Sequence, residues 1–228
     1  MDMMPYPPSF ILVLGLDGDL QCSKKIKQSR IQIKKRALIL NAAERVFARY
    51  GFAGSRLKEI AKEAGLPKAN ILYYFKSKEA LYRYVCQDIL ENWLSAIGDI
   101  SESSEPSEAL RNYIEAKMEL SIRRPNASRV FAMEIISGAP VIGDYLANEL
   151  KSWVDNHVQI FQVWQKRGQL ADVSPYHTFF VIWAVTQTYA DFETQIELVL
   201  GDQHLGSDEY GRAMKSVTQI ILSGLTPR

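Results

Sequence analysis

Two short apolar stripes separated by Gly-Leu-Pro constrain the fold more than any other part of the chain. In the stretch from Ser55 to Lys78, apolar residues first repeat at i, i+3, i+4 and i+7, which predicts a short amphipathic helix capped by Ser55. Gly65 favours the left-handed conformation that ends a helix, and Pro67 suits a helix start because it has no N–H to lose. The pattern predicts two helices joined by a tight turn, a helix-turn-helix.

The second helix of this pair, residues 68 to 74, presents small, amide and hydroxyl side chains outward, and Ile71 and Leu72 are expected to face inward. Such side chains can approach base edges of DNA, while flanking cations and hydroxyls hold phosphates. We expect Lys68 and Asn70 to contact bases. The candidate DNA-binding residues are Ser55, Arg56, Lys68, Ala69, Asn70, Tyr73, Tyr74 and Lys78. An ordinary helical hairpin is the alternative interpretation of these residues alone.

Charge is distributed unevenly along the chain and favours the DNA-binding interpretation. Residues 20 to 84 hold 16 Lys and Arg against 4 Asp and Glu, whereas residues 85 to 228 hold 11 against 19. The whole chain nevertheless has a formal net charge of only +1. Positive charge confined to one part of a chain indicates a polyanionic partner for that part. The basic run from Ser23 to Arg36 can either remain a solvated tail or lie along DNA, and beside a helix-turn-helix we favour DNA contact.

The run from Ile39 to Leu81, which contains AERVFARYGFAGSRLKEIAKEAGLPKANILYYFKSKEAL, resembles the DNA-binding domain of TetR-type transcriptional regulators. The similarity rests on the FxxxGF, IAxxAG and FxxKexL elements of that family, which are specific when they occur together. Pro67 is a departure, because the family usually has Ser or Thr at this position, so a capping hydroxyl is missing.

A polar pair interrupts the otherwise apolar region of the C-terminal part. Trp183, Gln187 and Asp191 follow at i, i+4 and i+8, so they share one helical face. A buried amide and carboxylate need partners, since each unsatisfied group costs about 1 to 3 kcal/mol. Those partners can be other helices, a dimer interface or a bound ligand.

Three further segments favour a bound ligand as the partner of Gln187 and Asp191. PNASRVFAMEIISGAP, WAVTQTYADFETQIELV and the closing IILSGLTPR resemble the Rut-type branch of the same family, which controls pyrimidine utilisation and senses uracil or thymine. The resemblance implies that the helix carrying Gln187 lines an effector pocket. The candidate effector-binding residues are Trp93, Trp183, Gln187 and Asp191, with a tryptophan supplying an aromatic wall.

Helical periodicity, broken by proline and glycine, continues through the remaining chain without an alternating strand pattern. The predicted class is all-α, with an N-terminal three-helix helix-turn-helix domain and a C-terminal α-helical domain for ligand binding and dimerisation. We expect a disordered extension and basic arm at 1–33, the DNA-binding domain at 34–76 and the effector-binding domain at 77–228. A long helix from residue 77 to about 97 is expected to join the domains. Further helices are expected at about 107–123, 127–137, 141–167, 175–200 and 208–223.

A homodimer is expected, because a single helix-turn-helix contacts few base pairs, and two-fold symmetry doubles the number of base contacts. The resemblance implies that the last two helices form its interface. The apolar residues expected there are Tyr189, Phe192, Ile196, Val199, Leu200, Val217, Ile220, Ile221 and Leu225.

Catalytic and metal-binding patterns are missing from the sequence, so we predict no enzyme activity, no metal site and no cofactor. HExxH, GxSxG, GxGxxG and the P-loop pattern are all absent. Isolated acids such as Glu134 and Asp191 are commonly hydrogen-bonded or solvated rather than catalytic. A small all-α enzyme is retained only as an alternative of a different class.

The sequence therefore favours a ligand-responsive transcriptional regulator of pyrimidine metabolism that binds operator DNA and uracil or thymine. The resemblance implies that it acts as a repressor. We expect it in the bacterial cytoplasm, because the apolar run from Phe10 to Leu16 is shorter than the roughly 20 residues a membrane span needs. The alternative within the same family is a repressor of efflux or lipid-metabolism genes with a lipophilic effector. Such a ligand calls for a pocket without the pair of Gln187 and Asp191.

Overall fold

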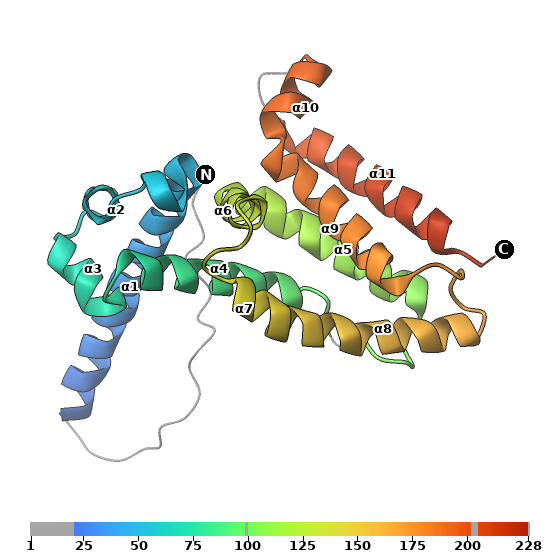
Figure 1. Ribbon diagram of the computed structural model, residues 1–228, viewed down its shortest axis with the longest axis horizontal. Helices are drawn as coiled ribbons and strands as arrows, with labels where there is room; N and C mark the ends of the chain where they lie inside the picture. Colours follow the sequence, from blue (N-terminus) through green and yellow to red (C-terminus); the bar gives the residue numbers. More distant parts are fainter. Residues whose placement is uncertain (1–20, 99, 202–204, 228) are drawn as a thin grey trace. The chain divides into compact units, whose positions relative to one another are not determined.

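The computed structural model describes residues 21–98, 100–201 and 205–227, with side chains described from Ile31 onward (Figure 1). These residues form helices and turns and no strand, which agrees with the predicted all-α class. They divide into two compact units, called here the N-terminal unit (to Val85) and the C-terminal unit (from Cys86). The elements are α1 (Gln21–Gly54), α2 (Leu57–Ala64), α3 (Lys68–Phe75), α4 (Lys78–Ser95), α5 (Pro106–Arg123), α6 (Pro125–Ile136), α7 (Gly143–Tyr145), the π-helix η1 (Leu146–Leu150), α8 (Lys151–Lys166), α9 (Pro175–Asp191), α10 (Glu193–Leu200) and α11 (Ser207–Leu225).

The N-terminal unit packs three helices around a small apolar core. α1 contacts α2, and α2 contacts α3. The apolar spacing places Ile39, Phe47, Ile60 and Ile71 fully inside. Full burial of one such side chain is worth about 1.5 to 3 kcal/mol. This packing stabilises α2 and α3, since helices of eight residues are marginal in isolation.

The basic arm differs from its prediction, because α1 already begins at Gln21 and residues 21–33 are helical rather than disordered. Residues 21 to 50 contain no proline or glycine, and Lys, Arg and Gln have good helix propensity, which outweighs a few tenths of a kcal/mol of like-charge repulsion per pair. The regular helix ends at Gly51, whose φ of 65° and ψ of 179° are not helical. Residues 1–20 of the expected extension lie outside the described residues.

The boundary between the units falls after Val85 rather than between residues 76 and 77. The first turns of α4 belong to the N-terminal unit because Tyr82 is part of its core. Its ring lies edge-on to that of Phe47, with centroids 4.8 Å apart, and 4.9 Å from that of Phe52. The hydrophobic contacts of α4 therefore move the boundary into this helix.

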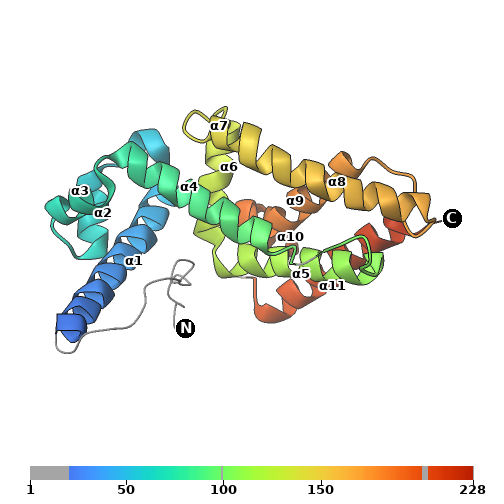
Figure 2. The same ribbon diagram turned by 90° about the horizontal axis from the view of Figure 1, so that it is seen from below.

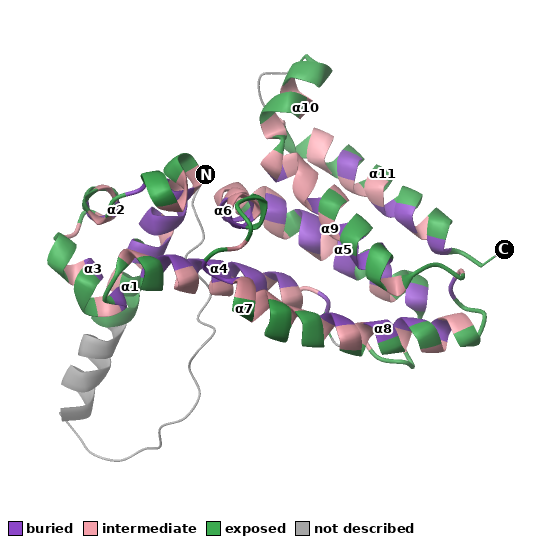
Figure 3. Ribbon diagram, in the orientation of Figure 1, coloured by how far each residue is buried: buried purple, intermediate pink, exposed green. Residues whose placement is uncertain are grey.

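The C-terminal unit is a helical bundle in which α5 and α9 lie side by side (Figure 1 and Figure 2). α6 and α8 also contact α9, while α11 contacts both α5 and α9. Buried residues follow the inward stripes of these helices (Figure 3). The core includes Leu110, Tyr113, Ile114, Val158, Phe161, Trp164, Phe179 and Ile182.

Two of the expected long helices are interrupted. The helix expected at 141–167 consists of α7, the π-helix η1 and α8 in succession. The helix expected at 175–200 breaks at Phe192, whose φ of −118° and ψ of 28° separate α9 from α10. The apolar spacing continues across this break, so periodicity alone could not reveal it.

Large apolar side chains remain exposed on the last helices (Figure 3). Leu198 and Val199 of α10 are 77% and 78% exposed, and Ile220 of α11 is 72% exposed. The expected interface residues Ile221 and Leu225 are instead buried within the bundle, because they occupy the inward face of α11. Their assignment to a dimer interface is therefore wrong.

Candidate functional site

The entry into α2 depends on Ser55, but not in the way the sequence predicted. Ser55 is 2% exposed, and its hydroxyl donates to the carbonyl oxygen of Phe52 at 3.0 Å. Arg56 occupies the N-cap position, and the Glu59 carboxylate accepts from its backbone N–H at 3.0 Å. Glu59 therefore satisfies the N–H of the N-cap residue, whereas the side-chain cap expected from Ser55 on the first free N–H groups of α2 is not formed. Because it is buried, the Ser55 side chain is also unsuited to contacting DNA.

The tight turn between α2 and α3 follows the prediction closely. Gly65 adopts the left-handed conformation, with φ of 64° and ψ of 29°. The backbone N–H of Leu66 donates to the carbonyl of Ala61 at 3.0 Å. Pro67 stands at the N-cap of α3, one position before the helix start. These contacts fix the direction in which α3 leaves the turn.

The outward face of α3 carries the side chains suited to reading bases. Lys68 and Ala69 are exposed, Asn70 is half-buried, and Tyr73 is 64% exposed. Ile71 and Phe75 face inward, whereas Leu72, which was expected inside, is 39% exposed. An eight-residue helix buries only the positions one turn apart, and Leu72 lies beside that stripe.

Lys78 is tied to the backbone that precedes α2. Its ammonium donates to the carbonyl oxygens of Phe52 at 2.6 Å and Ser55 at 3.0 Å. Two of its three donors are thus used within the N-terminal unit, which leaves one for a phosphate. Tyr74 is half-buried, and its ring lies edge-on to that of Tyr73 with centroids 5.1 Å apart.

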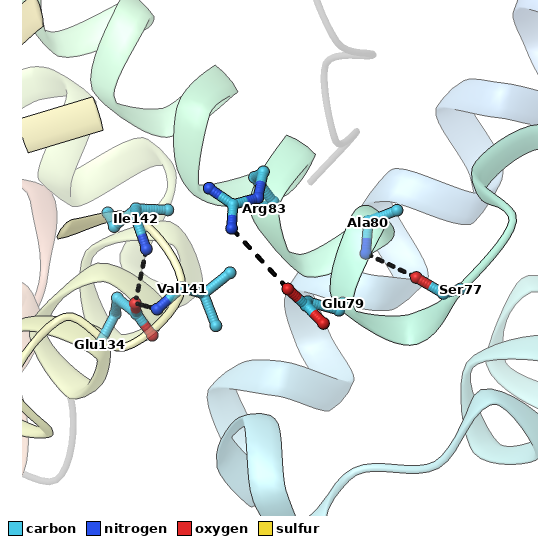
Figure 4. Close-up of polar contacts among 7 residues, drawn as sticks. All are labelled: Ser77, Glu79, Ala80, Arg83, Glu134, Val141 and Ile142. Carbon is cyan, nitrogen blue, oxygen red and sulfur yellow. Dashed lines mark hydrogen bonds and ion pairs between the residues drawn. The ribbon is translucent and has the colours of Figure 1, made fainter. Parts of the chain in front are cut away.

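The start of α4 is capped as predicted. Ser77 Oγ accepts from the backbone N–H of Ala80 at 3.0 Å, and Glu79 pairs with Arg83 at 3.8 Å (Figure 4). Sequence reasoning missed Lys76, an exposed cation at the end of α3 whose ammonium donates to the Tyr73 carbonyl at 3.2 Å. The sequence could have indicated an exposed cation here, because Lys76 directly follows the inward-facing Phe75.

The expected effector-binding residues lie in the C-terminal unit, in two sets of contacts. Trp93 of α4 is 5% exposed and packs edge-on against Phe131 of α6, with centroids 4.9 Å apart. Trp183 of α9 donates its indole N–H to the Tyr113 hydroxyl at 2.7 Å. Gln187, one turn further along α9, is half-buried. The indole N–H of Trp183 is therefore already satisfied, and Trp93 belongs to a different aromatic contact.

Asp191, the last residue of α9, carries a buried acceptor that no described residue satisfies. Its Oδ1 has no hydrogen-bond partner, and neither does Oγ of the fully buried Ser128 on α6. Burial raises the pKa of the Asp191 carboxyl, while the nearby Ser128 hydroxyl and the charges of Arg129 and Lys117 oppose that rise. The two oxygens lie near each other, but not in hydrogen-bond geometry. Arg129 itself pairs with Glu193 at 2.5 Å.

Lys117 of α5 was missed by sequence reasoning, although it lies beside these groups. It is 2% exposed, and its ammonium lies 4.3 Å from the centroid of the Trp93 ring. Burial lowers its pKa to about 7, and the attraction of Asp191 opposes this shift. The signal in the sequence was its place on the buried stripe of α5, between Ile114 and Ser121.

Other polar or hollow places in the described residues do not combine with the candidate sites above. Glu134 is buried, and its carboxylate accepts the backbone N–H groups of Val141 at 2.7 Å and Ile142 at 3.1 Å, a structural role (Figure 4). An open hollow between the start of α5 and α11 shares no residue with the Asp191 region. Within the described ranges, no three His, Cys, Asp or Glu side chains gather as metal ligands would. Nor does any helix there combine the length and apolar composition needed to cross a bilayer.

Comparisons with known proteins match both units. Residues 39–85 match the family described as bacterial regulatory proteins, tetR family, and residues 86–228 match the YcdC-like protein C-terminal region. The HTH-type transcriptional regulator RutR of Escherichia coli O157:H7 is 43% identical over 202 residues, or 89% of this chain and 95% of RutR. RutR of Escherichia coli K12 is 42% identical with the same coverage.

The fold agrees with these sequence matches. A tetR-family regulatory protein from Rhodococcus RHA1 superimposes with a TM-score of 0.68 at 19% identity, over 86% of this chain and 98% of its own. The chain therefore belongs to the TetR family and is a DNA-binding transcriptional regulator rather than an enzyme.

Proposed function

We propose that this protein is a repressor of pyrimidine-metabolism genes that leaves its operator, or binds it differently, when it binds uracil or thymine. Regulators of this family bind operator DNA and small-molecule effectors and form dimers. The identity of 42 to 43% with RutR over most of both chains supports the pyrimidine assignment. Its place of action is the cytoplasm, where bacterial operator DNA lies.

The DNA interface is the outward face of α3 with its flanking cations. Lys68 and Asn70 are placed at the start of α3 for base edges, with Ala69 and Tyr73 beside them. Arg56, Tyr74 and the remaining donor of Lys78 hold phosphates. The backbone contacts position the protein, while the base contacts determine its sequence preference.

The effector site is built around the unsatisfied Asp191 oxygen, which is the observation that carries this proposal. A pyrimidinedione has two N–H donors and two carbonyl acceptors on its ring. Gln187 can donate to a carbonyl and accept from the neighbouring N–H, and Asp191 can accept from the other N–H. Trp93 or Trp183 covers the ring. A lipophilic effector leaves these polar groups unpaired, which disfavours the efflux or lipid-metabolism alternative.

We propose that the protein binds its operator as a homodimer, with one helix-turn-helix from each subunit. The surface proposed to meet the partner subunit consists of the exposed apolar side chains of Phe192, between α9 and α10, and of Leu198, Val199 and Ile220 on α10 and α11. If the effector prefers a conformation in which the two heads no longer match the operator, DNA affinity falls by the difference in effector binding free energy between the two conformations.

Calorimetry with uracil, thymine and 1,3-dimethyluracil tests the effector proposal. We expect the first two to bind and dimethyluracil to fail, because both of its ring donors are blocked. Gln187→Ala should weaken uracil binding at least tenfold, about 1.4 kcal/mol, and leave DNA binding intact. Gln159→Ala, an exposed glutamine on α8, is the matched control. Equal binding of dimethyluracil, or no binding of uracil and thymine, would contradict the proposal.

A further inference from the structure

The Lys117 ammonium is buried with its hydrogen-bond capacity unused. It lies over the face of the Trp93 ring, and it makes no hydrogen bond or ion pair with any described residue. An ammonium has three N–H donors. Ser121, one turn along the same face of α5, is also buried and has an unsatisfied hydroxyl. The fold thus holds a cation almost wholly inside the bundle, with no described side chain hydrogen-bonded to it.

An unsatisfied acceptor lies within electrostatic range of this ammonium. The Asp191 carboxylate attracts Lys117 electrostatically, but the two charges form no ion pair. Ser128, which is fully buried beside Asp191, is unsatisfied as well. Opposite charges held apart in a low-dielectric interior are stabilised when a third group bonds to both.

We propose that Lys117 is an effector-binding residue, which donates a hydrogen bond to a ring carbonyl of a planar heterocycle whose adjacent N–H donates to Asp191. This assignment rests on the proposed function and adds a cationic contact to it. Each end of the ligand then satisfies one of the two separated charges.

The same pair of charges restricts the class of ligand. An anionic ligand that pairs with Lys117 is repelled by Asp191, and a hydrocarbon leaves both charges unpaired. An uncharged cyclic imide or lactam offers an acceptor and a donor on neighbouring atoms, which suits both side chains. Lys117 and Asp191 therefore select an uncharged polar ring.

Effector binding is also coupled to a proton, because the ammonium form of Lys117 donates a stronger, charge-assisted hydrogen bond to a carbonyl than the neutral amine does. The charged groups around it are Asp191 on α9 and, beside that carboxylate, Arg129 on α6, which pairs with Glu193. With the pKa of free Lys117 at about 7, complex formation above pH 7 takes up a proton.

Calorimetric titration with uracil and thymine, at pH 8 in two buffers of different ionisation enthalpy, tests this assignment. The variants are Lys117→Met, Lys117→Gln and the control Lys166→Met, an exposed lysine on α8. We expect Lys117→Met to bind at least tenfold more weakly and to lose proton uptake. Lys117→Gln should recover part of the affinity through its amide donor, but no proton uptake. Lys166→Met should match the wild type in both.

Melting temperatures without effector exclude a merely structural role. Replacing an unsatisfied buried cation by methionine should leave the melting temperature unchanged or raise it. A lower melting temperature with unchanged uracil affinity, or wild-type proton uptake in Lys117→Met, overturns the assignment of Lys117 alone. Failure of the wild type to bind uracil and thymine overturns the proposed function, and this assignment with it.

Discussion

The two units hold their functional cations in opposite surroundings. In the N-terminal unit, Lys68 and Lys76 are exposed on or beside a reading helix. In the C-terminal unit, Lys117 lies inside the bundle, against an aromatic ring and within electrostatic range of the half-buried Asp191. A polyanion as large as DNA is met by a surface, whereas a small uncharged ligand must be enclosed to be recognised. The difference between surface and interior therefore separates the two proposed binding functions within one chain.

The largest expected effect is that of salt concentration, which should change operator affinity strongly and uracil affinity little. Operator affinity should fall by about 10³- to 10⁵-fold between 50 and 200 mM salt, given roughly six to ten phosphate contacts. Uracil affinity should change less than about twofold, because its contacts are buried and screened little. Fluorescence anisotropy with operator DNA and calorimetry with uracil measure the two responses. A steep salt dependence of uracil binding would break the comparison.

Dimerisation should be the next most sensitive property. Val199→Glu places a charge on the exposed apolar surface of α10 and should weaken dimerisation on the order of a hundredfold, about 2.7 kcal/mol. The subunit fold should persist, because Val199 is 78% exposed. Ile136→Glu is the matched control, since Ile136 is 82% exposed but belongs to α6. Sedimentation that finds Val199→Glu as dimeric as the wild type would remove α10 from the interface.

The smallest expected effect is the change in the free energy of unfolding with pH. Because the pKa of Lys117 is about 7 in the folded protein and near 10.5 when unfolded, the unfolded chain binds more protons between these values. The stability of the wild type relative to Lys117→Met should therefore rise with pH above 7, by at most about 1.4 kcal/mol per unit. Below pH 7 the difference should be constant, with the burial penalty fully present. Urea denaturation from pH 6 to 9 measures it, and a flat difference would show that Lys117 is not perturbed.

Local sequence signals located the helix-turn-helix because its geometry is set within a few residues. Gly65 ends α2 by its own backbone conformation, and the apolar spacing turns Ile71 and Phe75 inward, which leaves Lys68 and Ala69 outside. The predictions that were wrong in this region concern contacts between residues that are far apart in the sequence. Ser55 and Lys78 are joined through 23 residues of chain, and a sequence pattern cannot show that their polar groups satisfy each other.

The sequence by itself determined the all-α class, the helix-turn-helix and the unequal distribution of charge, since these follow from periodicity, turn residues and composition. It also marked Asp191 as a polar residue on an apolar helix. Only the tertiary structure decided which groups lie near that carboxylate, because Lys117 and Ser128 come from two other helices and Lys117 packs over Trp93 of a third. The unsatisfied hydrogen bonds of Asp191 and Ser128 arise from packing between helices. Packing distances between distant segments are not encoded in any local pattern.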